Sequence, residues 1–373
     1  MGSPGVSIVP LAAPRATERE RLAAVRAGSQ LLHRPAKVRH PIDVVRESGP
    51  VQAQEPRAAR LAFRARSVRL TAADVDHART GDRSLLRAWV MRKTIHLIPS
   101  EDAGWMVPLF AEATVRWSRK RLADFGLDRR AQDRALKYIH DLIDAEGPLT
   151  RREIGVHLTE AGYELAAEFK VHLWLLATLD GELCLGPDRG AYACLVRTSD
   201  WLGKLKERSR EDSLAELARI YLRGYAPASE RDFARWAGLP LRDARVGFER
   251  IARELARDGE LMRLKKGARR PGRSPVVRML GAFDNYNLGY VDRGFAVGEA
   301  DVKQLAPGGG IIRPAITVDG AIVGTWSSKR SGRRLAVTIE PFAPLSNAVE
   351  SGLTDEVADL GRFEDLDATI PRP

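Results

Sequence analysis

One pattern recurs three times along this chain of 373 residues: helices separated by Gly- or Pro-containing turns, followed by short candidate strands. In the first copy, apolar residues at helical spacing predict a helix over 17–32, a second helix covers 41–46, and a third begins at Pro56 and runs to residue 65. Two strands, over 85–91 and 94–98, follow with Arg92 and Lys93 between them. A helix-turn-helix followed by a β-hairpin is typical of a winged helix.

The second and third copies follow the same order. The second has a helix over 133–145, a Gly-Pro turn in which Thr150 and Glu153 have the spacing of a capping box, a helix over 166–178, and a hairpin formed by 181–186 and 190–195. The third has a helix over 213–222, a turn capped by Ser229 and Asp232, a helix over 241–257 and a strand over 260–265. Recurrence without identical sequence predicts tandem winged helices.

Beyond residue 275 the apolar period changes from helical to alternating, over 316–318, 321–326 and 335–339, which predicts a small antiparallel β domain. We therefore predict an α+β chain. Its expected divisions are a leader over 1–15, winged helix 1 over 16–125, winged helix 2 over 126–200, winged helix 3 with a basic linker over 201–273, the β domain over 274–348, and an acidic tail over 349–373 that packs back as a short helix.

The charge of the chain points to a polyanionic partner. A net charge of +11 and a pI near 9.9, spread along the chain, attract nucleic acid, although an Arg-rich composition inherited from a GC-rich genome would give the same charge. No apolar run approaches the ~20 residues that cross a bilayer, and the N-terminus lacks the apolar core of a secretion signal. We expect a cytoplasmic protein associated with nucleoid DNA and with no membrane.

Two cysteines, Cys184 and Cys194, flank a turn-like segment over 186–190 and could face each other across a hairpin. Two reduced, structural thiols fit a cytoplasmic protein better. Three histidines, His140, His157 and His172, lack the spacing of a zinc site, and the chain has no Gly-x-Ser-x-Gly elbow and no P-loop.

Five segments in order resemble one known family: Val51-Gln52-Ala53-Gln54, Arg92-Lys-Thr-Ile-His96-Leu, Phe283-Asp-Asn-Tyr286, Pro307-Gly-Gly-Gly310 and Gly324-Thr-Trp326. Over residues 20–345 the chain resembles the AlkZ-like winged-helix DNA glycosylases, whose hallmark is Gln, an aliphatic residue, Gln. The resemblance implies a C-shaped array of winged helices closed by a β-barrel-like domain, with the Gln pair on the concave face. It also implies excision of N7- or N3-alkylated purines, bulky natural-product adducts or interstrand crosslinks, without metal or organic cofactor.

The pair Gln52 and Gln54 suits such a reaction, because a guanine alkylated at N7 is already cationic and leaves with little acid catalysis. What remains is to hold a water near C1′ and to stabilise the oxocarbenium character of the sugar. A Gln side chain offers one acceptor oxygen and two donors, and residues i and i+2 of an extended loop point the same way. The alternative is that both glutamines read adenine edges or phosphates, as in ordinary helix-turn-helix proteins.

Three further residues are candidates for a supporting role. His96 could contact the lesion or a phosphate, or be a satisfied structural histidine. Asp284 and Asn285 follow an apolar strand end, where they could orient water or support the cationic sugar, or could stabilise a turn through Asx hydrogen bonds.

Basic residues supply the predicted DNA contacts. The turn over 329–334 has the shape and charge of a hairpin that enters a minor groove or follows phosphates, although a solvated turn would look the same. The predicted contacts are Lys329, Arg330, Arg333 and Arg334 in this turn, Arg92 and Lys93 in the first wing, and Lys265, Lys266, Arg269, Arg270 and Arg273 in the linker.

Two functions follow from these observations. The first is a monofunctional, monomeric glycosylase that hydrolyses the N-glycosidic bond of alkylated purines in duplex DNA, for repair or for self-resistance to a genotoxic antibiotic. The alternative is a non-enzymatic transcription regulator, although such proteins commonly bind two half-sites as dimers and no dimerisation helix is evident.

Overall fold

A computed structural model describes residues 17–35, 37–163, 167–190, 192–266 and 275–371. The predicted leader over 1–15 and the linker residues Arg269, Arg270 and Arg273 lie outside these ranges. The described chain is α+β, as predicted, and none of its described helices is long and apolar enough to span a membrane.

Helix α1 (Glu18–Ser29) precedes the first copy. That copy consists of α2 (Pro41–Ser48), β1 (Val51–Gln52), α3 (Pro56–Arg66), α4 (Ala72–Thr80), β2 (Leu85–Trp89), a 3₁₀ turn (Met91–Lys93) and β3 (Ile95–Pro99). A 3₁₀ turn (Ser100–Asp102) and the long α5 (Ala103–Asp124) lead to the second copy. That copy consists of α6 (Arg129–Glu146), β4 (Leu149–Thr150), α7 (Arg151–Glu160), α8 (Ala167–Leu179), β5 (Leu183–Arg189) and β6 (Tyr192–Arg197).

The third copy follows α9 (Thr198–Leu202) and consists of α10 (Arg210–Tyr225), α11 (Glu230–Ala237), α12 (Leu241–Arg250), a 3₁₀ turn (Ala252–Glu254), β7 (Leu255–Asp258) and β8 (Leu261–Leu264). The C-terminal part contains β9 (Val277–Leu280), α13 (Asn285–Leu288), a 3₁₀ turn (Glu299–Asp301), α14 (Val302–Leu305), β10 (Ala315–Val318), β11 (Ala321–Ser331), β12 (Arg334–Pro341), α15 (Asn347–Glu364) and β13 (Asp367–Thr369).

All three copies share one order: a helix, a short pairing segment, two helices and two strands, with the pairing segment bonded to the last strand. In the first copy β1 pairs with β3, in the second β4 pairs with β6, and in the third a single bridge joins Ala228 to Met262 in β8. The recurrence predicted from the sequence is therefore present in the chain's topology.

The helices of the first copy were assigned wrongly from the sequence. The repeat uses α2, α3 and α4, whereas the prediction used the segments that become α1, α2 and α3. Helix α4 was missed because its only buried residues are Val75 and Ala78, which gives a weak apolar pattern, although Thr71 and Asp74 form a capping box at its start. Helix α1 lies outside the repeat and packs on α10 and β11.

Local signals placed most other elements correctly. The capping boxes of Thr150 with Glu153 and of Ser229 with Asp232 both form. The predicted helix over 241–257 is too long, because α12 ends at Arg250 and residues 255–258 form β7, which pairs with β8. Gly259, at a φ of 62°, makes the tight turn between these two strands.

A six-stranded antiparallel sheet, in the order β1-β3-β2-β5-β6-β4, runs through the first and second copies. The copies meet where Arg87 of β2 pairs with Leu185 of β5. Within this sheet Cys184 lies opposite Val196, so the two cysteines do not face each other. Both thiols are buried and unbridged, and burial raises the pKa of Cys184 to about 11.

The C-terminal sheet has the order β13-β12-β11-β10-β9 and stays open as a half-barrel. Strand β13 is parallel to β12, so the sheet is not purely antiparallel. The expected short C-terminal helix is α15, which has 18 residues, and it packs on β9 and β13. The tail therefore completes this half-barrel.

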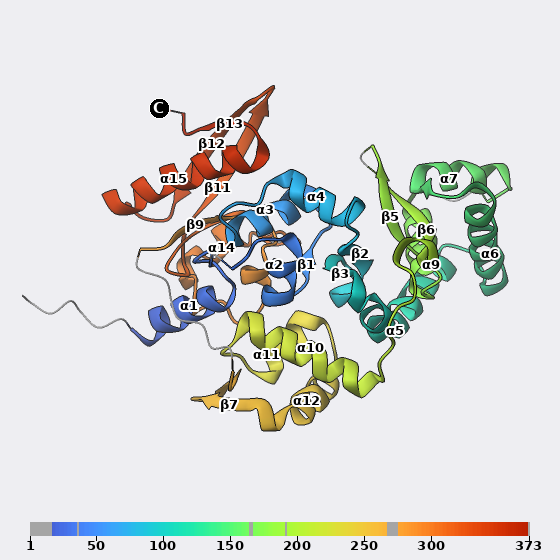
Figure 1. Ribbon diagram of the computed structural model, residues 1–373, viewed down its shortest axis with the longest axis horizontal. Helices are drawn as coiled ribbons and strands as arrows, with labels where there is room; N and C mark the ends of the chain where they lie inside the picture. Colours follow the sequence, from blue (N-terminus) through green and yellow to red (C-terminus); the bar gives the residue numbers. More distant parts are fainter. Residues whose placement is uncertain (1–16, 36, 164–166, 191, 267–274, 372–373) are drawn as a thin grey trace, which may run out of the picture.

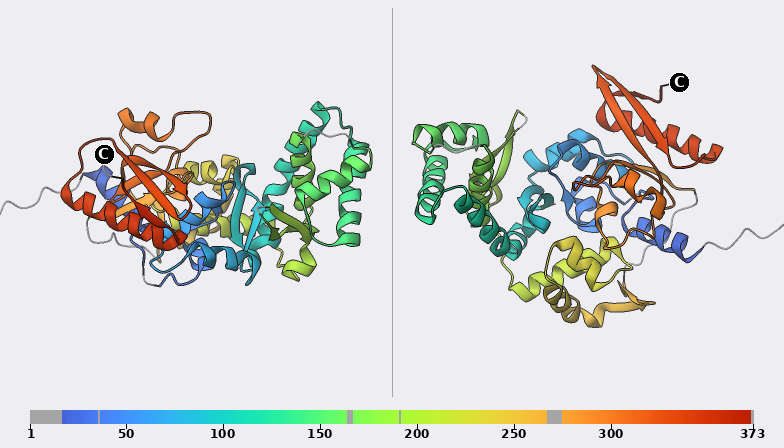
Figure 2. Two further views of the ribbon diagram at one scale, coloured as in Figure 1. Left: turned by 90° about the horizontal axis from the view of Figure 1, so that it is seen from above. Right: turned by 180° about the vertical axis from the view of Figure 1, so that it is seen from behind.

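Figure 1 shows the second copy projecting to one side of the molecule, away from the C-terminal sheet. Seen from above (Figure 2, left), the segment around α14 at one side and the second copy at the other rise beyond the middle, so the outline is a shallow C.

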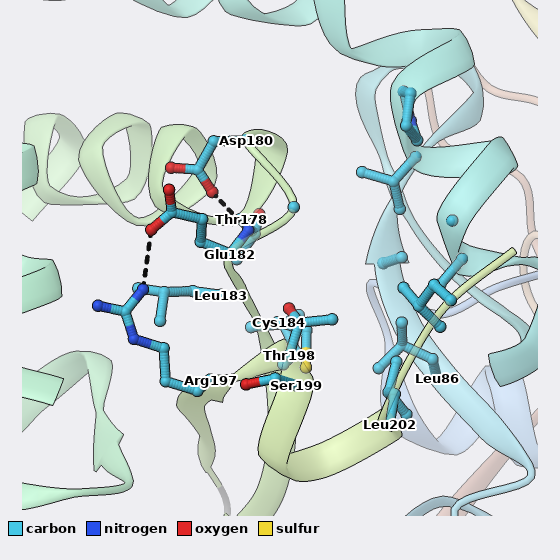
Figure 3. A pocket seen from close by; sticks show the side chains of 18 of the residues that line it. Leu86, Thr178, Asp180, Glu182, Leu183, Cys184, Arg197, Thr198, Ser199 and Leu202 are labelled. Atoms are coloured by element: carbon cyan, nitrogen blue, oxygen red, sulfur yellow. Dashed lines mark hydrogen bonds and ion pairs between the residues drawn. The ribbon is translucent and has the colours of Figure 1, made fainter. Parts of the chain in front are cut away.

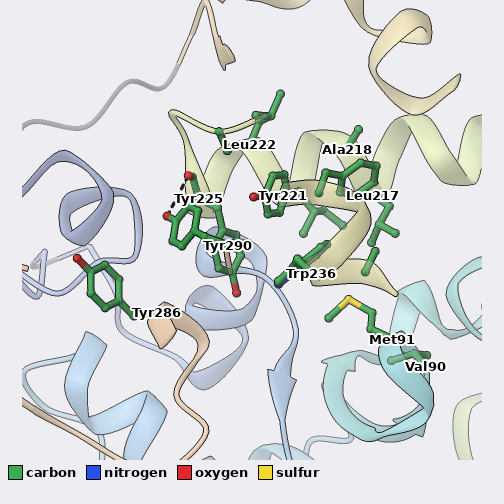
Figure 4. Close-up of a cluster of buried hydrophobic side chains, with 14 of the residues drawn as sticks. Val90, Met91, Leu217, Ala218, Tyr221, Leu222, Tyr225, Trp236, Tyr286 and Tyr290 are labelled. Carbon is green, nitrogen blue, oxygen red and sulfur yellow. Dashed lines mark hydrogen bonds between the residues drawn. The ribbon is translucent and has the colours of Figure 1, made fainter. Parts of the chain in front are cut away.

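A buried cluster ties the third copy to the first copy and to the C-terminal part (Figure 4). Its centre is aromatic: Tyr221 stacks on Tyr225 at 5.1 Å, and Trp236 lies 5.0 Å from Tyr221 between ring centroids. Val90 and Met91, at the end of the first hairpin, pack into the same cluster. The turn that carries Arg92 and Lys93 is thus anchored on the third copy.

Candidate active site

The segment with the two glutamines joins β1 to α3. In the second copy the strand residue Thr150 itself caps α7, and in the third Ser229 caps α11 directly after the bridging Ala228. In the first copy the cap of α3 is Glu55, so two residues, Ala53 and Gln54, lie between the strand and the cap. Gln54 therefore lies in a two-residue insertion directly after Gln52, at a junction that the other copies keep short.

Burial alternates along this segment. Val51 and Ala53 are 1% and 7% exposed and belong to the core, whereas Gln52 is partly exposed and Gln54 is exposed. The Ala53 amide donates to the Ile95 carbonyl at 2.7 Å, which extends the pairing of β1 with β3 past Gln52. Because side chains of an extended segment alternate, Gln52 and Gln54 lie on the face opposite the buried Val51 and Ala53.

The Gln52 side chain is held by Arg92. Arg92 Nη2 donates to Gln52 Oε1 at 3.0 Å and lies 3.2 Å from His96 Nε2. Gln52 and His96 are cross-strand partners in β1 and β3, which brings these two side chains to the same face of the sheet. The structure therefore joins three residues that the sequence analysis had assigned to different roles.

His96 is fully buried, so it does not reach a ligand directly in this structure. Burial, and then the nearby charge of Arg92, lower the pKa of His96 to about 3, which keeps the ring neutral. Its Nδ1 lies 3.1 Å from the Thr94 carbonyl oxygen, which can only accept a hydrogen bond. With the proton on Nδ1, Nε2 accepts from Arg92, so the ring has a partner on each nitrogen.

Arg92 points inward instead of outward as a wing residue would. Its Nη1 donates to the carbonyl of Trp236, one residue before the end of α11. Burial lowers the pKa of Arg92 to about 10, so it remains protonated at neutral pH. Lys93 is exposed and its ammonium lies 5.0 Å from the ring centroid of Trp117 on α5. Of the two predicted wing contacts, Lys93 is exposed and Arg92 is only partly exposed.

Asn285 and Asp284 lie behind the motif. Asn285 Nδ2 donates at 3.1 Å to the carbonyl of Pro50, which precedes β1. Asp284 caps α13 by accepting a hydrogen bond from the Tyr286 amide at 2.9 Å. It also forms a bidentate ion pair with the Arg66 guanidinium, at 2.7 and 2.8 Å. The side chains of Arg66 and Asp284 are both 0% exposed, which places this carboxylate inside the protein.

One cavity borders the motif at Ala53, and a second has none of the motif's residues on its walls. One of about 280 Å³ is lined by Ala53 and Pro56 together with three arginines and two aspartates: Arg60, Arg79, Arg87, Asp76 and Asp188. A more apolar one of about 540 Å³ lies between β2, β5 and α5, with Leu86, Cys184 and Leu202 on its walls (Figure 3). Neither is lined by Gln52 or Gln54.

The other predicted DNA contacts are on the surface. Strands β11 and β12 form a long hairpin whose tip, at Gly332 and Arg333, stands clear of the body in Figure 1. All four basic residues of this hairpin, Lys329, Arg330, Arg333 and Arg334, are exposed, and Arg333 pairs with the exposed Asp365 at 3.1 Å. Lys265 and Lys266 are exposed and directly follow β8 of the third copy.

Sequence reasoning missed Arg66, Gln30 and Trp236. Arg66 Nη2 also donates to Gln30 Oε1 at 2.8 Å, which links α1 to this network. The only sequence signal for Arg66 is a charged residue on the apolar face of α3, a pattern that calls for a buried partner. Nothing local identifies Trp236, which acts through its backbone carbonyl.

Comparison with known proteins identifies the family. Residues 45–363 match the family described as "DNA glycosylase AlkZ-like". An interstrand DNA cross-link repair glycosylase of Streptomyces sahachiroi is 26% identical over 313 residues, which cover 75% of this chain and 79% of that protein. The structure of the Streptomyces sahachiroi DNA glycosylase AlkZ superposes with a TM-score of 0.75 and 25% identity, covering 96% of this chain and 100% of that one.

These likenesses favour an enzyme that cleaves N-glycosidic bonds in DNA over a transcription regulator. The chain belongs to the AlkZ-like family of DNA glycosylases.

Proposed function

We propose that this glycosylase hydrolyses the N-glycosidic bond of an alkylated purine in duplex DNA, with N7-alkylguanine as the core substrate and bulky adducts or interstrand crosslinks within its range. The observation that carries the proposal is the segment 52–54, in which the last residue of β1 and the insertion that follows it present two neutral amides on the face opposite Val51 and Ala53, in a chain of this family. The similarity to the Streptomyces interstrand DNA cross-link repair glycosylase supports the wider substrate range.

Departure of an N7-alkylated base needs little acid catalysis, because the base is already cationic. The alkylated base departs with the electron pair of the C1′–N bond and becomes neutral, a water oxygen bonds to C1′, and the surplus proton passes to solvent. Gln52 and Gln54 would hold this water, and a neutral amide acts by positioning and electrostatics because it is too weak a base to take the proton itself. No step requires a metal ion.

We assign DNA binding to exposed cations on three parts of the chain. Lys93 follows Arg92 directly, the basic β11–β12 hairpin projects from the C-terminal sheet, and Lys265 and Lys266 extend the positive surface on the third copy. We propose that a monomer carries out the reaction. Gel filtration with light scattering checks this point.

The test is excision from a duplex that contains one N7-methylguanine, and from a second duplex with an N7-linked interstrand crosslink, followed by alkaline cleavage of the abasic site. Wild-type protein should release the base, and Gln52→Ala and Gln54→Ala should lose at least about hundredfold in single-turnover rate while they keep their DNA affinity. Gln304→Ala, at an exposed glutamine on α14, is the matched control and should behave as wild type.

The two duplexes separate the substrate classes. Release from the crosslink alone would restrict the substrate to bulky lesions. Tight binding to one palindromic sequence without release from either duplex would contradict the proposal and support a regulator.

A further inference from the structure

We propose that Arg92 is a positioning residue that fixes the Gln52 amide with its NH₂ group toward the substrate, so that Gln52 donates a hydrogen bond to the attacking water and Gln54 accepts one from it. This inference rests on the proposed function of the Gln pair. It gives the two glutamines different tasks, and it replaces the sequence-based expectation that Arg92 contacts a DNA phosphate.

The orientation of the Gln52 amide follows from the chemistry of its neighbour. A guanidinium has only donors, and a Gln side chain has one acceptor atom, its Oε1. The 3.0 Å contact from Arg92 Nη2 therefore requires Gln52 Oε1 to face Arg92 and Nε2 to face away. No other described residue accepts a hydrogen bond from Gln52 Nε2, so its two N–H groups are available to a ligand.

Arg92 itself has little freedom to leave this position. One Nη2 hydrogen serves Gln52 Oε1, the other serves His96 Nε2, and Nη1 serves the Trp236 carbonyl. Trp236 lies in the last turn of α11, where carbonyls lack helical partners and a cation is favoured. Three acceptors from two copies of the repeat thus hold one guanidinium.

The backbone around Arg92 is fixed as well. Arg92 and Lys93 have φ values of 53° and 59°, a left-handed pair typical of a tight hairpin turn and costly for residues with side chains. Met91, the preceding residue, is buried with Trp236 in the aromatic cluster (Figure 4). A Cβ on Gly238 would lie 2.9 Å from the backbone nitrogen of Arg92, so the third copy packs directly against this turn. Strain of this kind persists only where the surroundings impose it.

A division of labour between the glutamines follows. The water oxygen has two lone pairs: one accepts from Gln52 Nε2 and the other points at C1′. A water hydrogen donates to the Oε1 of Gln54, whose exposed side chain has no hydrogen-bond partner among the described residues and can rotate. The charge of Arg92 polarises the Gln52 amide and makes its N–H groups stronger donors.

The test compares single-turnover excision rates at saturating protein with dissociation constants measured across salt concentrations. Arg92→Lys keeps the charge but cannot serve three acceptors in a fixed fork. We expect its rate to fall about ten- to hundredfold, since a hydrogen bond to a charged group is lost. The affinity and its salt dependence should match wild type. Arg235→Lys, at an exposed arginine of α11 next to Trp236, is the matched control and should keep the wild-type rate.

Two further variants show how Arg92 acts. In a Gln52→Ala background, Arg92→Lys should cause no additional loss of rate, because its effect passes through Gln52. Arg92→Gly accommodates the positive φ, and millimolar guanidinium should restore part of its rate where methylammonium does not.

Failure of the inference about Arg92 can be distinguished from failure of the proposed function of the Gln pair. Lower affinity and a smaller salt slope at an unchanged saturated rate would make Arg92 a phosphate contact and overturn the inference. Losses that add up in the double variant, or a folded Arg92→Gly that guanidinium does not rescue, would also overturn it. A wild-type rate for Gln52→Ala would instead remove the proposed role of the Gln pair, which is a separate failure.

Discussion

Replacing Asp284 by Asn tests whether this carboxylate supports the fold or the reaction. In the structure Asp284 neutralises Arg66 at 2.7 Å, with both side chains 0% exposed. Asp284→Asn keeps an acceptor for the Tyr286 amide but leaves the Arg66 charge buried without a counter-charge. Breaking a buried pair in this way costs about 3–5 kcal/mol, a large share of the roughly 5–15 kcal/mol that stabilises a typical domain.

The assay is urea unfolding followed by tryptophan fluorescence, with excision measured at a low temperature at which the variant is still folded. Asp284→Asn should lower the urea midpoint substantially and keep its excision rate within about threefold of wild type. Adding Arg66→Met removes the orphaned charge, so the double variant should recover about half or more of the lost stability, as buried pairs replaced by apolar residues do.

The reasoning would be refuted by an Asp284→Asn protein with an unchanged midpoint and an excision rate at least a hundredfold lower. Such a result would mean that Asp284 acts on water or on the sugar, and that the ion pair opens when DNA binds.

Three other predictions follow. Because burial lowers the pKa of His96 to about 3 from 6.5, its contribution to stability is fully present above pH 6.5 and is lost as the pH falls toward 3, at up to about 1.4 kcal/mol per pH unit. Urea midpoints between pH 7 and 5 should therefore fall less steeply for His96→Gln than for wild type; equal slopes would contradict the burial argument. Gly238→Ala, which brings a Cβ to 2.9 Å from the backbone nitrogen of Arg92, should lower the excision rate about tenfold without changing DNA affinity. Gly259→Ala, in the β7–β8 turn with a similar positive φ of 62° but open space around it, should not. The last variant replaces the four hairpin cations by Ser: Lys329, Arg330, Arg333 and Arg334. It should reduce the salt slope of DNA binding by about one for each phosphate contact that is lost. An unchanged slope would exclude the hairpin from the interface.

The elements that could be predicted from the sequence carry their signals within a few residues. Thr150 with Glu153 and Ser229 with Asp232 mark helix starts three residues away, and each box forms. Hairpins follow from alternation and turn residues in the same way. Helix α4 was missed because its stability comes from packing on neighbouring elements, which its own sequence does not encode strongly.

The candidate site shows the same limit. The identity of Gln52 and Gln54 came from a short motif, but their support comes from distant parts of the chain. Arg66 and Asp284 are 218 positions apart, and Arg92 and the Trp236 carbonyl are 144 apart. Before folding nothing distinguishes an arginine that will turn inward from one that will meet a phosphate, so Arg92 was assigned to DNA.

The first copy also shows why a repeat of this kind need not read DNA in the usual way. In a DNA-reading winged helix the second helix of the helix-turn-helix enters the major groove. Here the third helix of the repeat, α4, carries Asp74 and Asp76, and its Arg79 is ion-paired with Asp188 of the neighbouring copy. That helix is therefore acidic and partly covered.

The inserted segment before α3 offers what α4 does not. It is open on the side of the two amides, and it is held from behind by elements of three regions. Asn285 of the C-terminal part binds the Pro50 carbonyl, Arg92 of the first hairpin binds Gln52, and Trp236 of the third copy binds Arg92. A group that must position water within a fraction of an ångström needs such support, whereas a base-reading side chain on a lone helix does not. The convergence of three regions on Pro50 and Gln52, directly before the two-residue insertion, is therefore the structural argument for catalysis at this junction.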